Sequence, residues 1–132
     1  AFATDQIQAI GTDDVAALTS TQVQSLSSTQ LRALTTDQIQ ALETTDVAAI
    51  RSSALATLTT DQIEALTTDQ VAALKTSQLT ALTTAQIQAI GTDDIAVLDS
   101  RQVASLTTGQ VEALTTAQVD ALTTALAEIL AD

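Results

Sequence analysis

The chain has 132 residues, a formal net charge of −12 at pH 7, and 45% hydrophobic residues, with Phe2 as its single aromatic side chain. This hydrophobic content predicts a folded chain rather than an acidic disordered segment, and the negative charge excludes nucleic acid, whose affinity comes from Lys and Arg. The sequence has no Cys or His and no apolar run of the roughly 20 residues that span a membrane, so we expect no disulfide, no His-based catalysis and no membrane insertion.

Residues 3–130 form sixteen consecutive units of eight residues, with the consensus Thr-Thr-Asp-Gln-Ile-x-Ala-Leu and no insertion. The second position is always Thr or Ser, the eighth is always Leu or Ile, and the fifth is Val, Ile or Leu in every unit but the last. A continuous helix would rotate this apolar pattern by about 80° per unit, because each residue turns the helix by about 100°. The helix is therefore expected to stop and restart in each unit.

Within a unit we expect a helix of about one and a half turns over the third to eighth positions. The hydroxyl of the second position, for example Thr60, is the expected N-cap, and the Asp that often follows it would lie in the first turn, where the helix dipole favours negative charge. The fifth and eighth side chains would face the core. Gly11 and Gly91 occupy the first position, where a left-handed residue after the preceding helix would suit glycine.

A second period of 24 residues begins at residue 27 and sorts the fifth positions into three families. The families are Leu31, Leu55 and Leu79; Ile39, Ile63 and Ile87; and Val47 and Val71. We therefore predict an all-α solenoid with one short helix per unit and about three units, or 24 residues, per coil. The earlier units follow another phase, which points to one unit gained or lost near residue 19.

The alternative fold is a three-sided β-solenoid, because Thr, Val and Ile also favour strands. The recurring Gln, Ala and Leu, and the three-residue spacing of the inward positions, favour the helical solution. In either case we expect residues 1–132 to form one capped solenoid domain. Phe2 is the expected cap at one end, and the other end has the spacing of an amphipathic closing helix through Leu122, Leu126, Ile129 and Leu130. We expect residues 51–58 to be the weakest unit, because Ala54 and Thr57 replace the usual Gln and Ala.

The residue types predict no enzyme, no catalytic residue, no cofactor and no metal site. The hydroxyls have no His to activate them, and the isolated glycines form no phosphate-binding loop. The pairs Asp13–Asp14 and Asp93–Asp94 carry oxygen ligands for a hard cation, but they lack the glycine turn and the bidentate Glu of an EF-hand. Calcium is therefore not an expected partner.

Two surfaces are candidates for binding. The first is the side of the predicted prism that carries all four basic residues, Arg32, Arg51, Lys75 and Arg101. It suits a protein partner or an acidic side of a second copy, unless one column of units simply diverged. The second is a set of ranked threonine pairs that resembles the faces of ice-binding solenoids, unless the threonines only cap helices: Thr35, Thr36, Thr59, Thr60, Thr83, Thr84, Thr107 and Thr108.

The unit Thr35 to Leu42, followed by Glu43 to Ile50, resembles the Thr/Gln/Ala/Leu octapeptide arrays of very long bacterial surface or secreted proteins. Such proteins are often described as adhesins or haem-utilisation proteins. The resemblance covers all sixteen units but transfers no binding residue, and the sequence offers no haem ligand. It implies a non-catalytic structural or adhesive spacer that lies outside the cell or on its surface. The alternative function is a surface-binding module that acts through the threonine ranks or the basic side.

Overall fold

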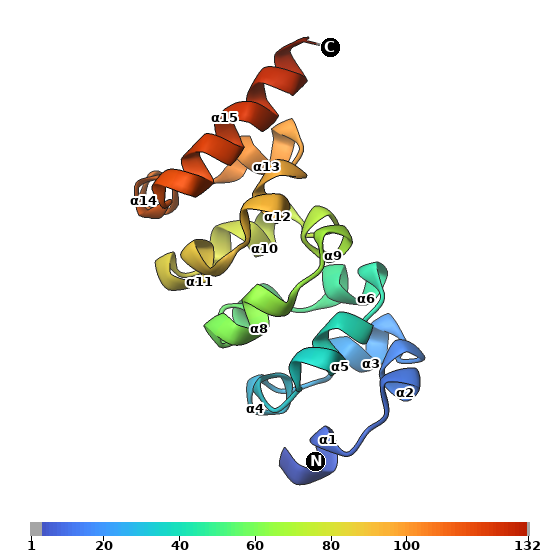
Figure 1. The fold of residues 1–132 in the computed structure, drawn as a ribbon. Helices are drawn as coiled ribbons and strands as arrows, with labels where there is room; N and C mark the ends of the chain where they lie inside the picture. The colour runs from blue at the N-terminus through green and yellow to red at the C-terminus, as the bar shows by residue number, and fades with distance from the viewer. Residues whose placement is uncertain (1–3, 132) are drawn as a thin grey trace.

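The computed structural model describes residues 4–131, which form fifteen α-helices and no strand (Figure 1). The predicted all-α solenoid is confirmed, and the β-solenoid alternative is wrong. The helices are α1 (Thr4–Gln8), α2 (Thr12–Ala16), α3 (Ser20–Gln24), α4 (Ser28–Arg32), α5 (Thr36–Ala41), α6 (Thr44–Ala49), α7 (Ser52–Leu55), α8 (Thr60–Ala65), α9 (Thr68–Ala72), α10 (Thr76–Ala81), α11 (Thr84–Ala89), α12 (Thr92–Ala96), α13 (Ser100–Ser105), α14 (Thr108–Ala113) and α15 (Thr116–Ala131).

Each helix begins at the second position of its unit, so the N-cap is the first position and not the second. Thr35, for example, has an extended backbone (φ −74°, ψ 164°), and its hydroxyl accepts a hydrogen bond from the N–H of Gln38 at 3.2 Å. The capping role predicted for second-position hydroxyls such as Thr60 is therefore wrong, because those residues already belong to the helix. The side chains that cap in this way are Thr19, Ser27, Thr35, Thr59, Thr67, Thr83, Asp99, Thr107 and Thr115.

The predicted left-handed glycines are also absent. Gly11 and Gly91 are N-cap residues with extended backbones, at φ −65° and ψ 153° and at φ −64° and ψ 153°. No residue between 4 and 131 has a positive φ. The preceding helices end instead in right-handed or extended residues such as Ile90 (φ −68°, ψ 128°), so the chain turns each corner in conformations open to any residue.

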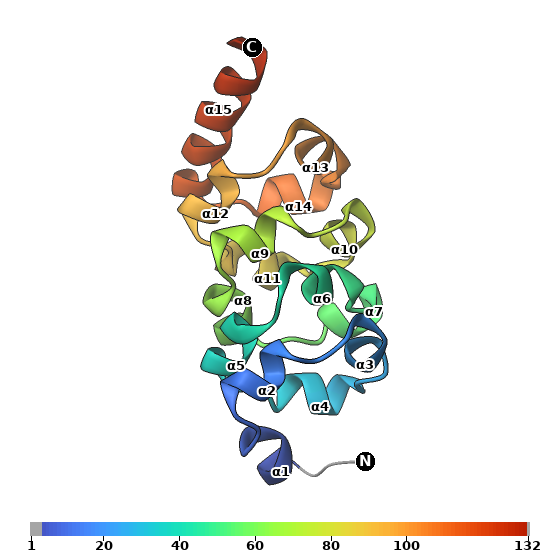
Figure 2. The same ribbon diagram turned by 90° about the vertical axis from the view of Figure 1, so that its right-hand side faces the viewer.

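The helices stack in three columns, and stacked neighbours are three units apart (Figures 1 and 2). Column A contains α1, α4, α7, α10 and α13; column B contains α2, α5, α8, α11 and α14; and column C contains α3, α6, α9, α12 and α15. The prediction of about three units per coil is confirmed. The stacking already includes α1 with α4, α2 with α5 and α3 with α6, so the change of sequence phase near residue 19 does not interrupt it.

The core is a column of aliphatic side chains from the fifth and eighth positions, as predicted. Fifth-position side chains from Ile7 to Ile95 are 0–2% exposed, and eighth-position side chains from Leu34 to Leu98 are 3–6% exposed. Towards the end of the described chain, the fifth-position Val111 and Val119 are 46% and 43% exposed. In the first coil it is the eighth-position residues, such as Leu18, that are only partly buried. Each coil therefore covers the fifth positions of the coil before it and the eighth positions of the coil after it.

The last two units form one continuous helix, the 16-residue α15, which extends beyond the final coil in Figure 1. The hydroxyls of Thr123 and Thr124 donate to the carbonyl oxygens of Val119 and Asp120 at 2.9 and 3.1 Å, so these residues continue a helix rather than start one. Leu122 is buried. The other expected caps lie outside the described side chains, namely Phe2, Leu126, Ile129 and Leu130. No helix in the described range is long and apolar enough to cross a membrane.

Candidate interaction surface

The fourth-position glutamine links the coils to one another. The Gln38 side chain, at the start of α5, donates from Nε2 to the carbonyl oxygens of Ile7 at 2.8 Å and Ile10 at 2.7 Å. These acceptors lie at the end of the α1 unit, just before α2, on which α5 stacks. Eight glutamines make this contact, each with acceptors 31 and 28 residues earlier: Gln38, Gln62, Gln70, Gln78, Gln86, Gln102, Gln110 and Gln118. We call this series the glutamine ladder and each member a rung.

Each rung uses one buried carboxamide to form hydrogen bonds with the start of its own helix and the end of a helix in the preceding coil. In Gln78, Oε1 accepts from the N–H of the N-cap residue Lys75 at 2.9 Å, while Nε2 donates to Val47 O and Ile50 O at 2.9 and 2.7 Å. The ladder glutamines are only 1–4% exposed. Because every short helix leaves unpaired N–H and C=O groups at its two ends, this arrangement removes a cost that recurs in every unit.

Sequence reasoning missed the ladder, although a signal for it was present. Gln recurs at the fourth position, and a Gln three residues after an N-cap is one half of a capping box. The other half of its role, donation to another coil, depends on the coil geometry. The recurrence of Gln at the fourth position was the only clue to that role in the sequence.

One missing rung is replaced by an arginine. Ala54 occupies the fourth position of residues 51–58, and Leu26 O is the acceptor that a Gln there would reach. Arg51, the N-cap residue of the same helix, donates instead from its guanidinium to Leu26 O at 3.0 Å. With four residues, α7 is the shortest helix of the described chain. This short helix is consistent with the expectation that residues 51–58 form the weakest unit.

At two other fourth positions a buried aspartate stands in place of the ladder glutamine, and we call these positions the aspartate rungs. Asp46 is 2% and Asp94 is 7% exposed. Ser20 Oγ donates to Asp46 Oδ1 at 3.2 Å, whereas Asp46 Oδ2 is buried and has no hydrogen-bond partner. Burial raises the pKa of Asp94, repulsion from Asp93 raises it further, and a hydrogen bond from the Gly91 backbone opposes the shift. These carboxylates therefore stand where a neutral amide donor is the rule.

The raised pKa of Asp94 predicts a pH-dependent stability. The folded state binds this proton more tightly than the unfolded state, so the charged carboxylate lowers stability at neutral pH. This loss is recovered as the pH falls through the folded-state pKa towards the ordinary aspartate value of 3.8. In metal-free buffer, Asp94→Asn is expected to be more stable than the wild type at pH 7, with a smaller difference near pH 4. Denaturant unfolding of both proteins at the two pH values measures this, and a difference that does not depend on pH would contradict it.

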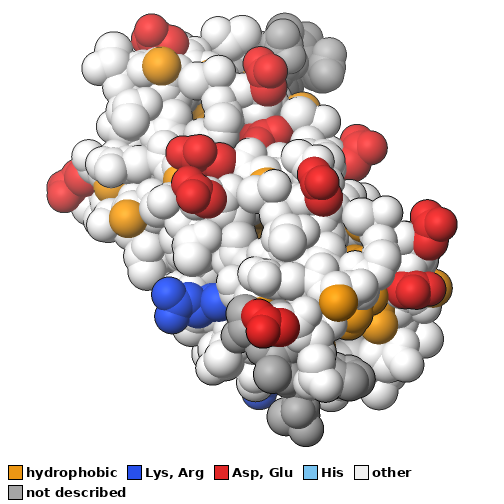
Figure 3. All heavy atoms as spheres, turned by 60° about the horizontal axis from the view of Figure 1, so that its bottom comes forward, with side chains coloured by type: hydrophobic (Ala, Val, Ile, Leu, Met, Phe, Trp, Pro, Cys, Tyr) orange, Lys and Arg blue, Asp and Glu red, His pale blue; other side chains and the backbone are white. Residues whose placement is uncertain are grey.

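The four basic residues lie on one column, as the sequence predicted. Arg32 is at the end of α4, Arg51 and Lys75 are the N-cap residues of α7 and α10, and Arg101 lies in α13, so column A carries one basic side chain in each of four consecutive coils. All four are exposed, and none forms an ion pair within the described chain. In Figure 3 Lys and Arg atoms are visible only in the lower part of the view, as one larger group and a small part nearer the bottom edge, whereas Asp and Glu side chains are spread over the rest of that view.

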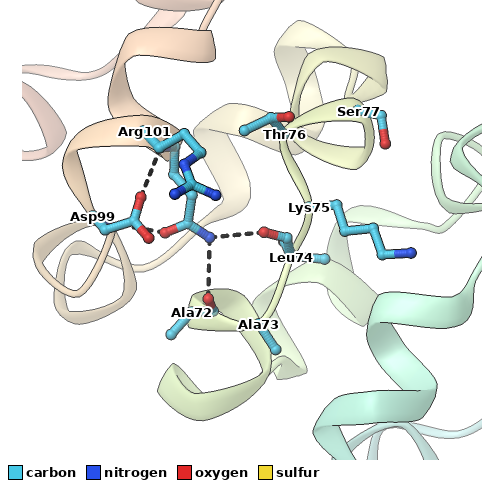
Figure 4. Close-up of a pocket in the computed structure, with 9 residues that line it drawn as sticks. Ala72, Ala73, Leu74, Lys75, Thr76, Ser77, Asp99 and Arg101 are labelled. Atoms are coloured by element: carbon cyan, nitrogen blue, oxygen red, sulfur yellow. Dashed lines mark hydrogen bonds between the residues drawn. The ribbon is translucent and has the colours of Figure 1, made fainter.

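A surface hollow of about 440 Å³ lies beside two of these basic residues (Figure 4). Lys75 and Arg101 both line it, but Figure 4 shows the Lys75 side chain pointing away from Arg101. Gln102, which also lines it, is already bonded, because its Nε2 donates to Ala72 O and Leu74 O at 3.1 and 2.8 Å. The two basic side chains therefore do not converge on this hollow and act as an open surface.

The threonine pairs lie in column B, on α5, α8, α11 and α14. The first hydroxyl of each pair, in Thr35, Thr59, Thr83 and Thr107, is occupied as an N-cap. The second residue of each pair is exposed at the start of its helix, as Thr36 illustrates. The structure thus brings the predicted ranks together but assigns half of their hydroxyls to capping.

The described residues contain no group of three or more Asp, Glu, His or Cys side chains that could hold a metal ion.

Comparison with known proteins finds one family model, described as the ALTTAQ repeat, which matches residues 1–28, 7–44, 39–76 and 71–108. The overlapping matches together span most of the chain. No curated protein and no solved structure matches it.

Proposed function

Because the chain belongs to the ALTTAQ repeat family, we propose that it is a non-catalytic spacer that holds other parts of an extracellular or cell-surface protein at a distance. The glutamine ladder is the observation that carries this proposal. Eight equivalent rungs join successive coils, and the same bonds are available to any further coil with the same repeat. The function is mechanical, since it requires length and stiffness rather than a reactive group.

The contacts of the chain support a role that depends on length. Helices contact the helices three units away, so each coil is stabilised by its immediate neighbours. In such a one-dimensional array, stability is approximately a sum of unit and neighbour contributions, and coils can be added without a new core. A spacer or adhesive stalk makes use of this property.

Insertion of one extra coil tests the spacer proposal. A second copy of residues 59–82, which contain α8, α9 and α10, is placed after Leu82. We expect the same helicity per residue by circular dichroism and a maximum dimension in small-angle X-ray scattering that grows by about 10 Å, the thickness of one helix layer. A scrambled 24-residue insert of the same composition is the control. An unchanged maximum dimension for the true repeat would contradict the proposal.

The proposed location has its own test. Antibodies raised against the folded chain should label intact cells of the native host, and protease added outside the cells should remove the signal. Labelling that requires lysis would contradict an extracellular or cell-surface position, while leaving the solenoid itself unaffected.

A second candidate function is lateral self-association, which one specific pattern of charge favours. Column A carries one exposed basic residue per coil, within or at the N-cap of α4, α7, α10 and α13. Column C carries one exposed acid per coil, within or at the N-cap of α6, α9, α12 and α15. The acids are Glu43, Asp69, Asp93 and Asp120. Both series advance by one coil per charge, so column A of one copy can face column C of another in register. Each dimer leaves one column A and one column C free, so growth continues beyond two copies.

Sedimentation at several salt concentrations tests this association. The net charge of −12 repels a second copy at low salt, so we expect assembly to be strongest near about 0.1 M salt and absent near about 1 M. Lys75→Gln with Arg101→Gln should abolish it, whereas Gln40→Glu with Ala85→Glu changes the net charge equally on column B and should not. A monomer at every salt concentration, with the chain at several hundred micromolar, would rule it out.

A further inference from the structure

The rungs of the ladder concentrate backbone oxygens at one point. Around Gln62, the carbonyl oxygens of Leu31, Arg32 and Leu34 lie 2.9, 3.1 and 2.9 Å from Nε2. Three carbonyl dipoles thus converge on the position of a single amide nitrogen. Whatever occupies that position in a rung must carry positive charge or donate hydrogen bonds, because oxygens alone repel one another there.

Asp46 and Asp94 occupy this environment without the nitrogen. By the register of the ladder, 31 and 28 residues earlier, Asp46 corresponds to Val15 O and Leu18 O, and Asp94 corresponds to Ile63 O and Leu66 O. Neither Leu18 O nor Leu66 O accepts a hydrogen bond within the described chain. An ionised carboxylate cannot donate to these oxygens. Each aspartate rung therefore leaves one carbonyl oxygen, Leu18 O or Leu66 O, without a donor, whereas Val15 O and Ile63 O accept from the backbone N–H of Leu18 and Leu66.

The shorter side chain holds its oxygens further from the carbonyl groups. Asp has one methylene fewer than Gln, so its oxygens lie about 1.5 Å further from the carbonyl groups than Nε2 does. The separation between carboxylate and carbonyl oxygens then becomes about 4 Å, which a Ca²⁺ ion bridges at its usual oxygen distances of about 2.3–2.6 Å. Mg²⁺ needs shorter bonds, of about 2.1 Å, and releases its water reluctantly.

A buried oxygen without a partner marks the Asp46 rung. Asp46 Oδ2 is buried and unpaired, although the other oxygen of that carboxylate accepts from Ser20 Oγ. A buried ionised oxygen with no partner is costly, so a bound cation would remove a specific defect. Thr68, 26 residues before Asp94, is the sequence counterpart of Ser20 at the second rung.

We propose that the aspartate rungs at Asp46 and Asp94 are calcium sites, in which Ca²⁺ takes the place of the glutamine amide. Each site combines a carboxylate from one coil with two carbonyl oxygens from another, and a Ser or Thr hydroxyl and water complete the coordination. Such a set has one carboxylate and takes other oxygens from the backbone, unlike the EF-hand loop with which the pairs Asp13–Asp14 and Asp93–Asp94 were compared. Calcium would thereby join coils at points where the ladder lacks its amide.

Thermal melting of the full chain tests the proposal. In buffers of equal ionic strength, about 5 mM CaCl2 is expected to raise the melting temperature by about 5 °C over the chelator-treated protein, whereas MgCl2 has less than half that effect. The double variant Asp46→Gln with Asp94→Gln should lose the calcium response. The control is Asp61→Asn with Asp69→Asn, which removes the same charge from exposed positions and should keep the response.

Calorimetric titration with CaCl2 provides a second readout. We expect two sites in the wild type and one in each single variant, Asp46→Gln or Asp94→Gln, so the result does not depend on the folding of the double variant. The proposal is overturned if the wild type shows no response, if the double variant responds equally, or if Mg²⁺ acts as strongly as Ca²⁺. Stabilisation by acid alone, without a calcium response, would identify a proton as the occupant and would likewise overturn it.

Discussion

Gln78→Ala is expected to lower the free energy of unfolding by about 3 kcal/mol, because it removes three hydrogen bonds from a buried site. Gln78 is 1% exposed, accepts from the Lys75 N–H, and donates to Val47 O and Ile50 O. The side chain of Lys75 offers no cap in its place, so α10 loses its N-terminal partner and the α6 unit loses its C-terminal donor. Denaturant unfolding monitored by circular dichroism measures the change.

Gln40→Ala is the matched control, because Gln40 is an exposed residue at the sixth position of its unit. It should change the unfolding free energy by less than about 0.5 kcal/mol, as surface substitutions do. If the two variants were equally stable, the ladder would not be a main source of stability.

Asp94→Gln is expected to raise the free energy of unfolding at pH 7 by about 2 kcal/mol in metal-free buffer, because it removes a buried charge and restores a rung. The new amide would donate to Ile63 O and Leu66 O, in the register that Gln86 and Gln102 follow on neighbouring helices. Increased stability from a single substitution is uncommon, so its direction alone is informative.

Asp94→Asn separates the two contributions to this gain. The shorter amide removes the charge but does not reach the carbonyl oxygens, so it should give only part of the increase. A stability of Asp94→Gln equal to or below that of the wild type would show that the carboxylate is better accommodated than the ladder register implies.

The general fold was predictable because the repeat carries it openly. The eight-residue period excludes a continuous helix, the fifth and eighth positions identify the core, and the families of Leu31, Ile39 and Val47 give three sides. All of these follow from the spacing and the apolar character of the repeated residues, which can be read from the sequence alone. The position of the basic residues on one side followed from the same count.

The position of the N-cap was not predictable from residue frequency. Ser or Thr occupies the second position in every unit, whereas the first position varies from Thr35 to Glu43, Lys75 and Gly91. Invariance therefore pointed to the wrong residue. The second-position hydroxyl makes no recurring hydrogen bond in the described units, and the cap in most units is the more variable neighbour.

The binding partners of the glutamines depend on geometry that no local pattern contains. The acceptors of Gln38 lie 31 and 28 residues earlier, whereas the sequence period is 24. That offset arises because the start of one helix lies against the end of the unit that precedes the helix below it. The same geometry explains why Asp46 and Asp94, which resemble ordinary first-turn acids in the sequence, are buried in the structure.

The most direct test of the ladder is nuclear magnetic resonance of the glutamine side-chain amides. We expect slow hydrogen exchange for the eight ladder glutamines, with nuclear Overhauser contacts to residues 31 and 28 earlier, such as Gln78 to Val47 and Ile50. The exposed Gln24 and Gln40 should exchange rapidly. Equally rapid exchange for all of the glutamines, or contacts restricted to their own units, would contradict the proposed link between coils.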